Sequence, residues 1–217
     1  MNKLIRIVPL AGVAYALLAV IGNGTIGAFP DENTTVAKLE TFYSSHHVGV
    51  ERGGVILYWS AFFLALFLVS LWARFRGTDM HPLISGALLL GATLTVAGEF
   101  AGAGTYSMLG AVGDKTVIAP AALQALHVTG AGGSPITGDG GLMILLLAAA
   151  AGGIATRALP RWLSWSALPL GLVQLTPIGF FAGLVFWLWA AAAGIYMAVR
   201  PAPAGAPGAV GEPAFAR

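Results

Sequence analysis

Five long apolar segments occupy most of this 217-residue chain. They run from Leu4 to Phe29, from Gly53 to Trp72, from Pro82 to about Leu109, from Gly141 to Ala158 and from Trp162 to Val199. A hydrocarbon layer of about 30 Å needs roughly 20 helical residues to cross it. Because that layer holds no water for unpaired backbone groups, such segments fold as helices. The pattern predicts an all-α integral membrane bundle.

Charged residues are too few for a soluble protein. They make up 9% of the chain, hydrophobic residues make up 57%, and the mean hydropathy is +0.81. A soluble domain has about 25% charged residues. A formal net charge of +2 does not favour a nucleic-acid partner. Without cysteine there is no disulfide framework and no thiolate metal site.

The last apolar segment predicts two spans. As one helix it would be almost twice as long as the hydrocarbon layer is thick. Thr176-Pro177-Ile178-Gly179 supplies a break near its middle, because proline interrupts the helical hydrogen bonds. The first segment exceeds the apolar core of a signal peptide, so we expect it to be a retained span. The total is six transmembrane helices.

Basic residues predict the orientation. With the N-terminus in the cytoplasm, the inner segments hold Lys3, Arg6, Arg74, Arg76, Arg157, Arg161, Arg200 and Arg217, whereas the outer ones hold only Lys38, Arg52 and Lys115. This excess is what the positive-inside rule requires, and it places both termini in the cytoplasm.

The remaining segments predict how the chain is organised outside the spans. The long outer loops, Pro30–Arg52 and Tyr106–Gly140, are expected to carry short interfacial helices at Thr41–His47 and Pro120–His127. Residues 1–200 form one transmembrane domain, and residues 201–217 are a disordered cytoplasmic tail.

Glu99 is the acidic residue that the six-span arrangement places inside a span. It lies about 25 Å along the third span from the cytoplasmic end. A charged carboxylate at membrane depth costs about 2.5–3.5 kcal/mol on insertion scales, so this side chain should face protein or water. Burial favours the protonated form of a carboxyl group, which can donate a proton. A structural acid paired with another helix is the alternative.

Asp139 precedes the fourth span near the same membrane face as Glu99. It suits a helix N-terminus, and it also suits a second catalytic acid, because two carboxyl groups in different environments can divide acid and base roles. Polar and aromatic residues expected to contact a substrate in this half of the bundle are Asn23, Tyr58, Trp59, Thr95, Tyr106, Gln174 and Phe180. Tyrosine and tryptophan near span ends also serve as interface anchors.

We expect neither a metal nor a cofactor. The chain has no phosphate-binding loop, nucleophile elbow or HExxH motif, and no paired histidines at haem spacing. His46 and His47 are adjacent and diverge, while His46, His47 and His127 are predicted to lie on the same side as Asp139.

Two resemblances extend these expectations. The chain resembles small multi-pass proteins of unknown function in the plasma membrane of high-GC Gram-positive bacteria. This resemblance rests on Phe42-Tyr43-Ser44-Ser45-His46, Ala158–Trp165 and Thr176–Phe180. In size and chemistry the chain also resembles the membrane-bound terpene cyclases of meroterpenoid pathways. This second resemblance implies that Glu99 and Asp139 act as the acids that cyclise a lipid-soluble prenylated substrate.

Three hypotheses follow from these features. The first is a cofactor-independent cyclase with Glu99 as general acid. The second is a small proton-coupled carrier in which Glu99 titrates. The third is a non-catalytic membrane partner protein that binds through its outer loops.

Overall fold

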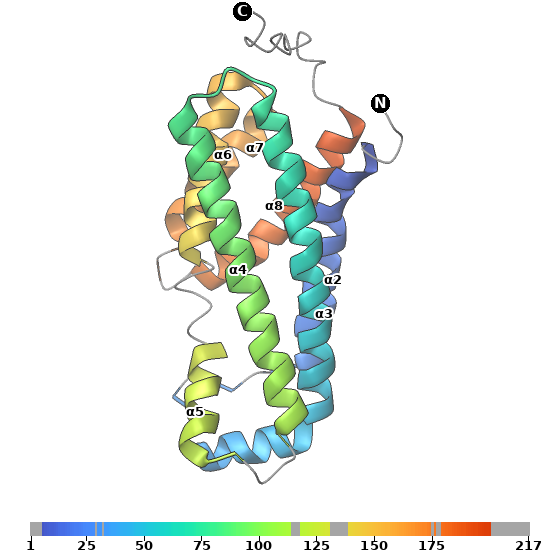
Figure 1. Ribbon diagram of the computed structural model, residues 1–217, viewed down its shortest axis with the longest axis vertical. Helices are drawn as coiled ribbons and strands as arrows, with labels where there is room; N and C mark the ends of the chain where they lie inside the picture. The colour runs from blue at the N-terminus through green and yellow to red at the C-terminus, as the bar shows by residue number, and fades with distance from the viewer. Residues whose placement is uncertain are drawn as a thin grey trace, which may run out of the picture.

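The computed structural model describes residues 6–28, 30–31, 33–113, 118–130, 139–174, 176 and 179–200, without the side chain of Phe180. In this part of the chain the regular secondary structure is helical, as predicted (Figure 1). The elements are the 3-10 turn η1 (Val8–Leu10) and the α-helices α2 (Ala11–Ile26), α3 (Val36–Arg76), α4 (Pro82–Val112), α5 (Pro120–Val128), α6 (Gly140–Thr156), α7 (Arg161–Val173) and α8 (Gly179–Val199). The predicted tail, residues 201–217, lies outside the described residues.

The predicted break in the last apolar segment is confirmed. Helix α7 ends at Val173 and α8 begins at Gly179. With 13 residues, α7 is about 20 Å long, which is shorter than the hydrocarbon layer. Helix α5 also confirms the short helix predicted at Pro120.

The predicted outer loop from Pro30 to Arg52 is wrong over most of its length. Helix α3 begins at Val36 and continues for 41 residues, or about 60 Å. Its first part lies across the end of the bundle before the helix turns along α4 (Figure 1). Likewise, Tyr106 does not begin a loop but belongs to the last turns of α4.

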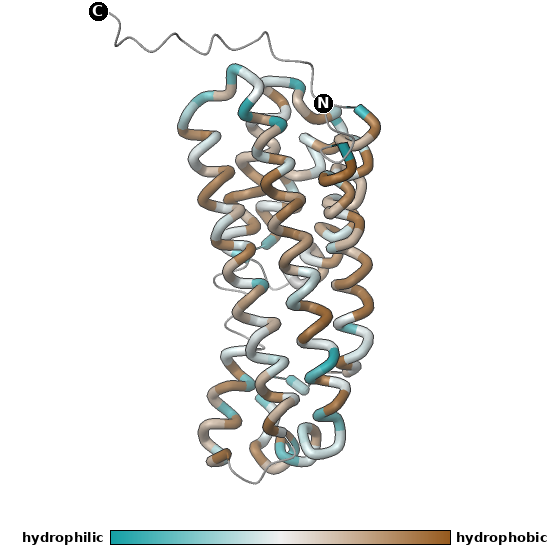
Figure 2. The backbone as a smooth tube through the Cα atoms, turned by 45° about the vertical axis from the view of Figure 1, so that its right-hand side comes forward, coloured by the Kyte–Doolittle hydropathy of each residue, from teal (hydrophilic) through white to brown (hydrophobic). Residues whose placement is uncertain are grey.

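Among the described residues, four helices are long and apolar enough to cross a membrane. They are Val8–Ile26, Val36–Arg76, Pro82–Val112 and Phe181–Val199, whereas Gly140–Thr156 is apolar but shorter. The most hydrophobic residues lie in the half of the molecule that contains α6 and α8, and the residues around α5 are less hydrophobic (Figure 2). The fold is therefore that of a helical membrane protein, with an extension at one end.

Two hydrophobic clusters match these two halves. The larger one joins α2, α3, α4, α6, α7 and α8 around residues such as Tyr15, Phe67, Leu145 and Phe186. The smaller one lies in the end lobe, which we define as the first part of α3, the last turns of α4, and α5. Its buried residues include Leu39, Tyr43, Leu109 and Leu123.

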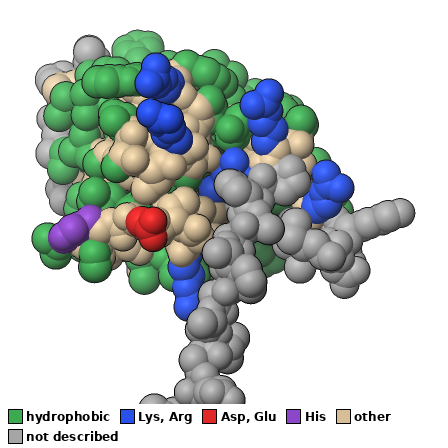
Figure 3. All heavy atoms as spheres, turned by 90° about the horizontal axis from the view of Figure 1, so that it is seen from above, with side chains coloured by type: hydrophobic (Ala, Val, Ile, Leu, Met, Phe, Trp, Pro, Cys, Tyr) green, Lys and Arg blue, Asp and Glu red, His purple; other side chains and the backbone are tan. Residues whose placement is uncertain are grey.

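Basic side chains gather at the opposite end, called the basic end here (Figure 3). They come from the end of α3 (Arg74 and Arg76), from the α6–α7 connection (Arg157 and Arg161) and from the end of α8 (Arg200). Arg74 is buried, and its side chain connects the end of α3 to the α6–α7 connection and to the end of α8. Its Nε donates to the Ala158 carbonyl at 2.8 Å, and its Nη1 donates to the Arg200 carbonyl.

Glycines allow α3 and α4 to touch near the end lobe. A Cβ atom at Gly110 would lie 2.2 Å from the Glu51 nitrogen, and one at Gly54 would lie 2.5 Å from the Ser107 nitrogen. Small residues let two helix backbones approach this closely. Toward the basic end the two helices diverge (Figure 1).

Candidate functional site

Glu99 lies on α4 and is joined to a helix distant in sequence. The Tyr15 hydroxyl of α2 donates a hydrogen bond to Glu99 Oε1 at 3.3 Å, across a separation of 84 residues. Tyr15 is 1% exposed, while Glu99 is only partly buried by the protein. The Glu99 side chain is thus anchored to α2 by a buried tyrosine.

Aromatic rings surround the Tyr15 anchor. The Phe186 ring of α8 lies 6.0 Å from the Tyr15 ring, and Trp189 stacks on Phe186 at 6.0 Å. The indole of Trp189 is held in place by a hydrogen bond from Nε1 to the Leu163 carbonyl at 3.0 Å. The Trp187 side chain also interacts with the Tyr15 hydroxyl. The acid therefore borders an aromatic cluster built from α2 and α8.

Asp139 lies close enough to Glu99 for the two carboxyl groups to interact electrostatically. It is the N-cap residue of α6, but its side chain makes no capping hydrogen bond. Partial burial raises the pKa of the Asp139 carboxyl. Neither Tyr15 nor Asp139 is a cation, so neither can neutralise a negative charge on Glu99.

Thr95 and Tyr106, which are expected to contact a substrate near Glu99, both donate their hydroxyls to backbone carbonyls. Thr95 is buried and donates to the Gly91 carbonyl of its own helix at 2.8 Å. Tyr106 donates to the Gly130 carbonyl at 3.4 Å, although its ring remains close enough to interact electrostatically with Glu99. Helical hydroxyls often bind a carbonyl one turn back, which explains the loss of Thr95 from the site.

Of four other residues predicted to contact a substrate, three are exposed and the fourth has a side chain outside the described residues. Asn23 is exposed and donates to the Ala19 carbonyl of its own helix at 2.9 Å. Tyr58 and Trp59 are 51% and 57% exposed, and their rings contact Phe100 and Phe62. This exposure fits interface anchors. The side chain of Phe180 lies outside the described residues.

Gln174 is a buried amide without a hydrogen-bond partner in the described structure. It is 3% exposed at the end of α7, and both its Oε1 and its Nε2 lack partners. Leaving a buried donor or acceptor unpaired costs about 1–3 kcal/mol. Such an amide suits a polar contact with a ligand or with water.

His127 belongs to the end lobe rather than to a site with Asp139. Its Nδ1 lies 3.0 Å from the Tyr43 hydroxyl, and its Nε2 lies 3.2 Å from the Asp31 carbonyl. Because only an N–H can bond to the carbonyl, Nε2 carries a proton in this arrangement. Among the described residues, no group of three His, Asp or Glu side chains could hold a metal ion.

Tyr15, which contacts Glu99, is not among the residues predicted from the sequence. It is the one tyrosine on the buried face of α2, which otherwise presents small residues such as Gly12, Ala16 and Ala19. A single hydroxyl among the small apolar side chains of that face is the feature of the sequence that could have pointed to Tyr15. Sequence spacing finds partners within one helix and cannot find a partner on another.

Comparison of the chain with protein-family models, with curated proteins and with solved structures finds no match. Its function is therefore inferred from the geometry around Glu99.

Proposed function

We propose that this protein is an integral membrane enzyme that protonates and cyclises a lipid-soluble isoprenoid or prenylated substrate. The observation that carries the proposal is the Glu99 carboxyl, which is hydrogen-bonded by the neutral Tyr15 hydroxyl inside an apolar bundle. An acid at membrane depth is costly, and by default it marks a functional site. The Glu99 residue is partly exposed, and we place the substrate against that exposed side.

The proposed reaction is an isomerisation. Protonated Glu99 transfers its proton to an epoxide oxygen, and the carbon–oxygen bond breaks to leave a carbocation. Alkenes of the chain then close rings by forming carbon–carbon bonds, and the last cation loses a proton to Asp139. Because one proton is gained and one is lost, substrate and product have the same composition.

The surroundings of Glu99 support a cationic intermediate. Aromatic faces attract cations, and Phe186 and Trp187 both contact Tyr15, the residue that binds the acid. The electrostatic interaction between Asp139 and Glu99 supports return of the proton from one to the other. No cofactor is needed for these steps.

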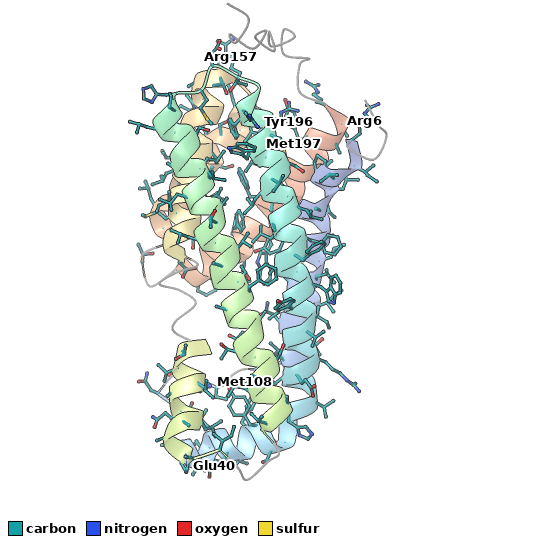
Figure 4. The ribbon with its side chains drawn as sticks, viewed as in Figure 1. Arg6, Glu40, Met108, Arg157, Tyr196 and Met197 are labelled. Carbon is teal, nitrogen blue, oxygen red and sulfur yellow. The ribbon has the colours of Figure 1, made fainter. Side chains whose placement is uncertain are left out.

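We further propose six spans, with the basic end in the cytoplasm of a bacterial cell and the end lobe outside. The supporting observation is that the Arg residues predicted to share a side lie together, because Arg74 contacts both Ala158 and Arg200. Figure 4 places Arg6 and Arg157 toward one end and Glu40 at the other.

The test uses membranes that contain the protein and a farnesylated arene with a terminal epoxide. We expect a cyclic product of unchanged mass, measured by chromatography with mass spectrometry. Glu99→Gln keeps the shape but cannot donate a carboxyl proton, so product formation should fall about 100-fold or more. Glu40→Gln, which removes an exposed acid in the end lobe, is the matched control and should retain full activity.

Two results would contradict the proposal. One is unchanged turnover in a folded Glu99→Gln variant. The other is proton flux across proteoliposomes that depends on Glu99 while no substrate tested is cyclised, because that result identifies a proton-coupled carrier.

A further inference from the structure

Helices α3 and α4 line an open apolar cavity of about 370 Å³ in the half of the bundle that leads to the basic end. Nine side chains line it, and Thr93 is the single polar one. The Thr93 hydroxyl already donates to the Leu89 carbonyl at 2.9 Å. A polar ligand would lose its hydrogen bonds to water here, so the lining matches a hydrocarbon chain.

The cavity exists because the contact between the two helices changes along their length. Near the end lobe, Gly54 and Gly110 allow the backbones to touch. Toward the basic end the helices diverge, and the facing positions include the small residues Ala65, Ala92 and Ala97. Beyond these alanines, the Tyr58 and Phe100 rings meet across the two helices at 4.8 Å. The cavity thus has an aromatic contact at one end and the basic end at the other.

A cation lies at the basic end of the cavity. Trp72 is part of the lining, and the Arg76 guanidinium lies 5.0 Å from the centre of the Trp72 ring. Arg76 is exposed, and it is the last residue of α3. The acyl chain of a ligand lying along Trp72 would therefore bring the ligand's headgroup next to the exposed guanidinium of Arg76. Guanidinium groups bind phosphate through paired hydrogen bonds.

We propose that this cavity binds one acyl chain of an anionic phospholipid whose phosphate contacts Arg76. The apolar lining selects the chain, and the charge of Arg76 selects the headgroup. Basic residues at the membrane surface attract anionic lipids. The acyl chain would enter the cavity from the leaflet at the basic end, where α3 and α4 diverge. This site does not depend on proton transfer by Glu99, which lies on α4 beyond the cavity lining.

Quenching of Trp72 by brominated lipids tests the proposal. The full-length protein is reconstituted into vesicles of phosphatidylcholine with a small fraction of either brominated phosphatidylglycerol or brominated phosphatidylcholine. The chain has 6 tryptophans, so the Trp72 signal is the difference between the wild type and Trp72→Phe. We expect brominated phosphatidylglycerol to quench this signal at about fivefold lower lipid fraction, the effect of one basic residue at the surface.

Two variants separate the headgroup contact from the chain contact. Arg76→Gln, at an exposed position, should remove the preference for phosphatidylglycerol. Ala92→Leu should fill the cavity and reduce quenching by both lipids. Ala151→Leu, at an exposed position on α6, is the matched control and should behave as the wild type. If Ala92→Leu does not fold, the Arg76→Gln comparison still decides the outcome.

Three results would overturn the proposal. Equal quenching by the two lipids would indicate ordinary surrounding lipid without a headgroup contact. A preference that survives Arg76→Gln would place the anionic lipid elsewhere. Shielding of Trp72 from both lipids, together with crosslinked dimers through α3 and α4, would show that a second copy of the chain covers this face.

Discussion

Tyr15 and Glu99 form the contact on which the proposed chemistry depends. A hydrogen bond to an ionisable group is worth about 1.5–3 kcal/mol when the group is charged, and about half of that when both partners are neutral. Tyr15 binds one carboxyl oxygen of Glu99, and the proposed reaction uses the other. In that proposal the tyrosine is a positioning residue for the acid.

Replacement of Tyr15 by phenylalanine tests this role. Tyr15→Phe keeps the ring against Phe186 but removes the hydroxyl, so the Glu99 carboxyl should lose its fixed orientation. We expect turnover to fall about tenfold, which corresponds to about 1.4 kcal/mol. Turnover and thermal unfolding in detergent are the measurements. Thr95→Val is the control, because the Thr95 hydroxyl serves its own helix. An equal loss of turnover in both variants would contradict the assigned role of Tyr15.

At the level of residues, the sequence predicts the acid but not its partner. Glu99 can be found from the sequence because a carboxyl group inside an apolar segment is costly and therefore rare. Thr95 and Tyr106 share its helix face, yet their hydroxyls bind the Gly91 and Gly130 carbonyls. The Tyr15 contact depends on how α2 packs against the rest of the bundle, which no spacing within α4 encodes.

At the level of elements, α3 and α4 set the shape of the molecule. Their contact is close near the end lobe and open toward the basic end, and the glycines mark the close part. An added methyl group at such a contact forces the backbones apart, and overpacking costs about 1–3 kcal/mol.

Two glycines of α4 provide a matched test of this contact. A Cβ at Gly110 would meet the Glu51 backbone, whereas one at Gly104 would meet nothing within 4 Å. Gly110→Ala should lower the free energy of unfolding by about 1–3 kcal/mol. Gly104→Ala should raise it by about 0.5–1 kcal/mol, because alanine restricts the unfolded chain. Denaturant unfolding in detergent measures both, and destabilisation by Gly104→Ala would contradict the described packing of α4.

The sequence predicts most helix boundaries but not the start of α3. Proline and glycine mark the beginnings of α4, α5, α6 and α8, so these boundaries lie close to the predicted ones. The segment from Val36 to Arg52 contains many polar residues and therefore resembles a loop. Its buried residues Leu39, Tyr43 and Val50 nevertheless recur at intervals of four and seven, as on one face of a helix.

For the whole molecule, the unequal distribution of charge predicts how it lies in the membrane. The end lobe carries exposed acids such as Glu40, and the opposite end carries the Arg residues. Cationic loops stay in the cytoplasm. The end lobe should therefore face outward.

The chain has no cysteine, so single introduced thiols report this orientation directly. Glu40→Cys in the end lobe should react in intact cells with a maleimide that cannot cross the membrane. Asp79→Cys, in the exposed turn between α3 and α4, should react only after the cells are permeabilised. Labelling is measured by the mass shift of the protein on a gel. The reverse pattern would invert the proposed topology, and equal labelling of both in intact cells would contradict a membrane-spanning arrangement.

The bond between Tyr15 and Glu99 also bears on the order in which the molecule is made. A ribosome synthesises α2 well before α4, so Tyr15 precedes Glu99 into the membrane by 84 residues. The Tyr15 hydroxyl is therefore made before the acid that it binds, so this bond needs no part of the chain that follows α4. Phe186 and Trp187 are synthesised later with α8, and the aromatic cluster around Tyr15 is complete only then.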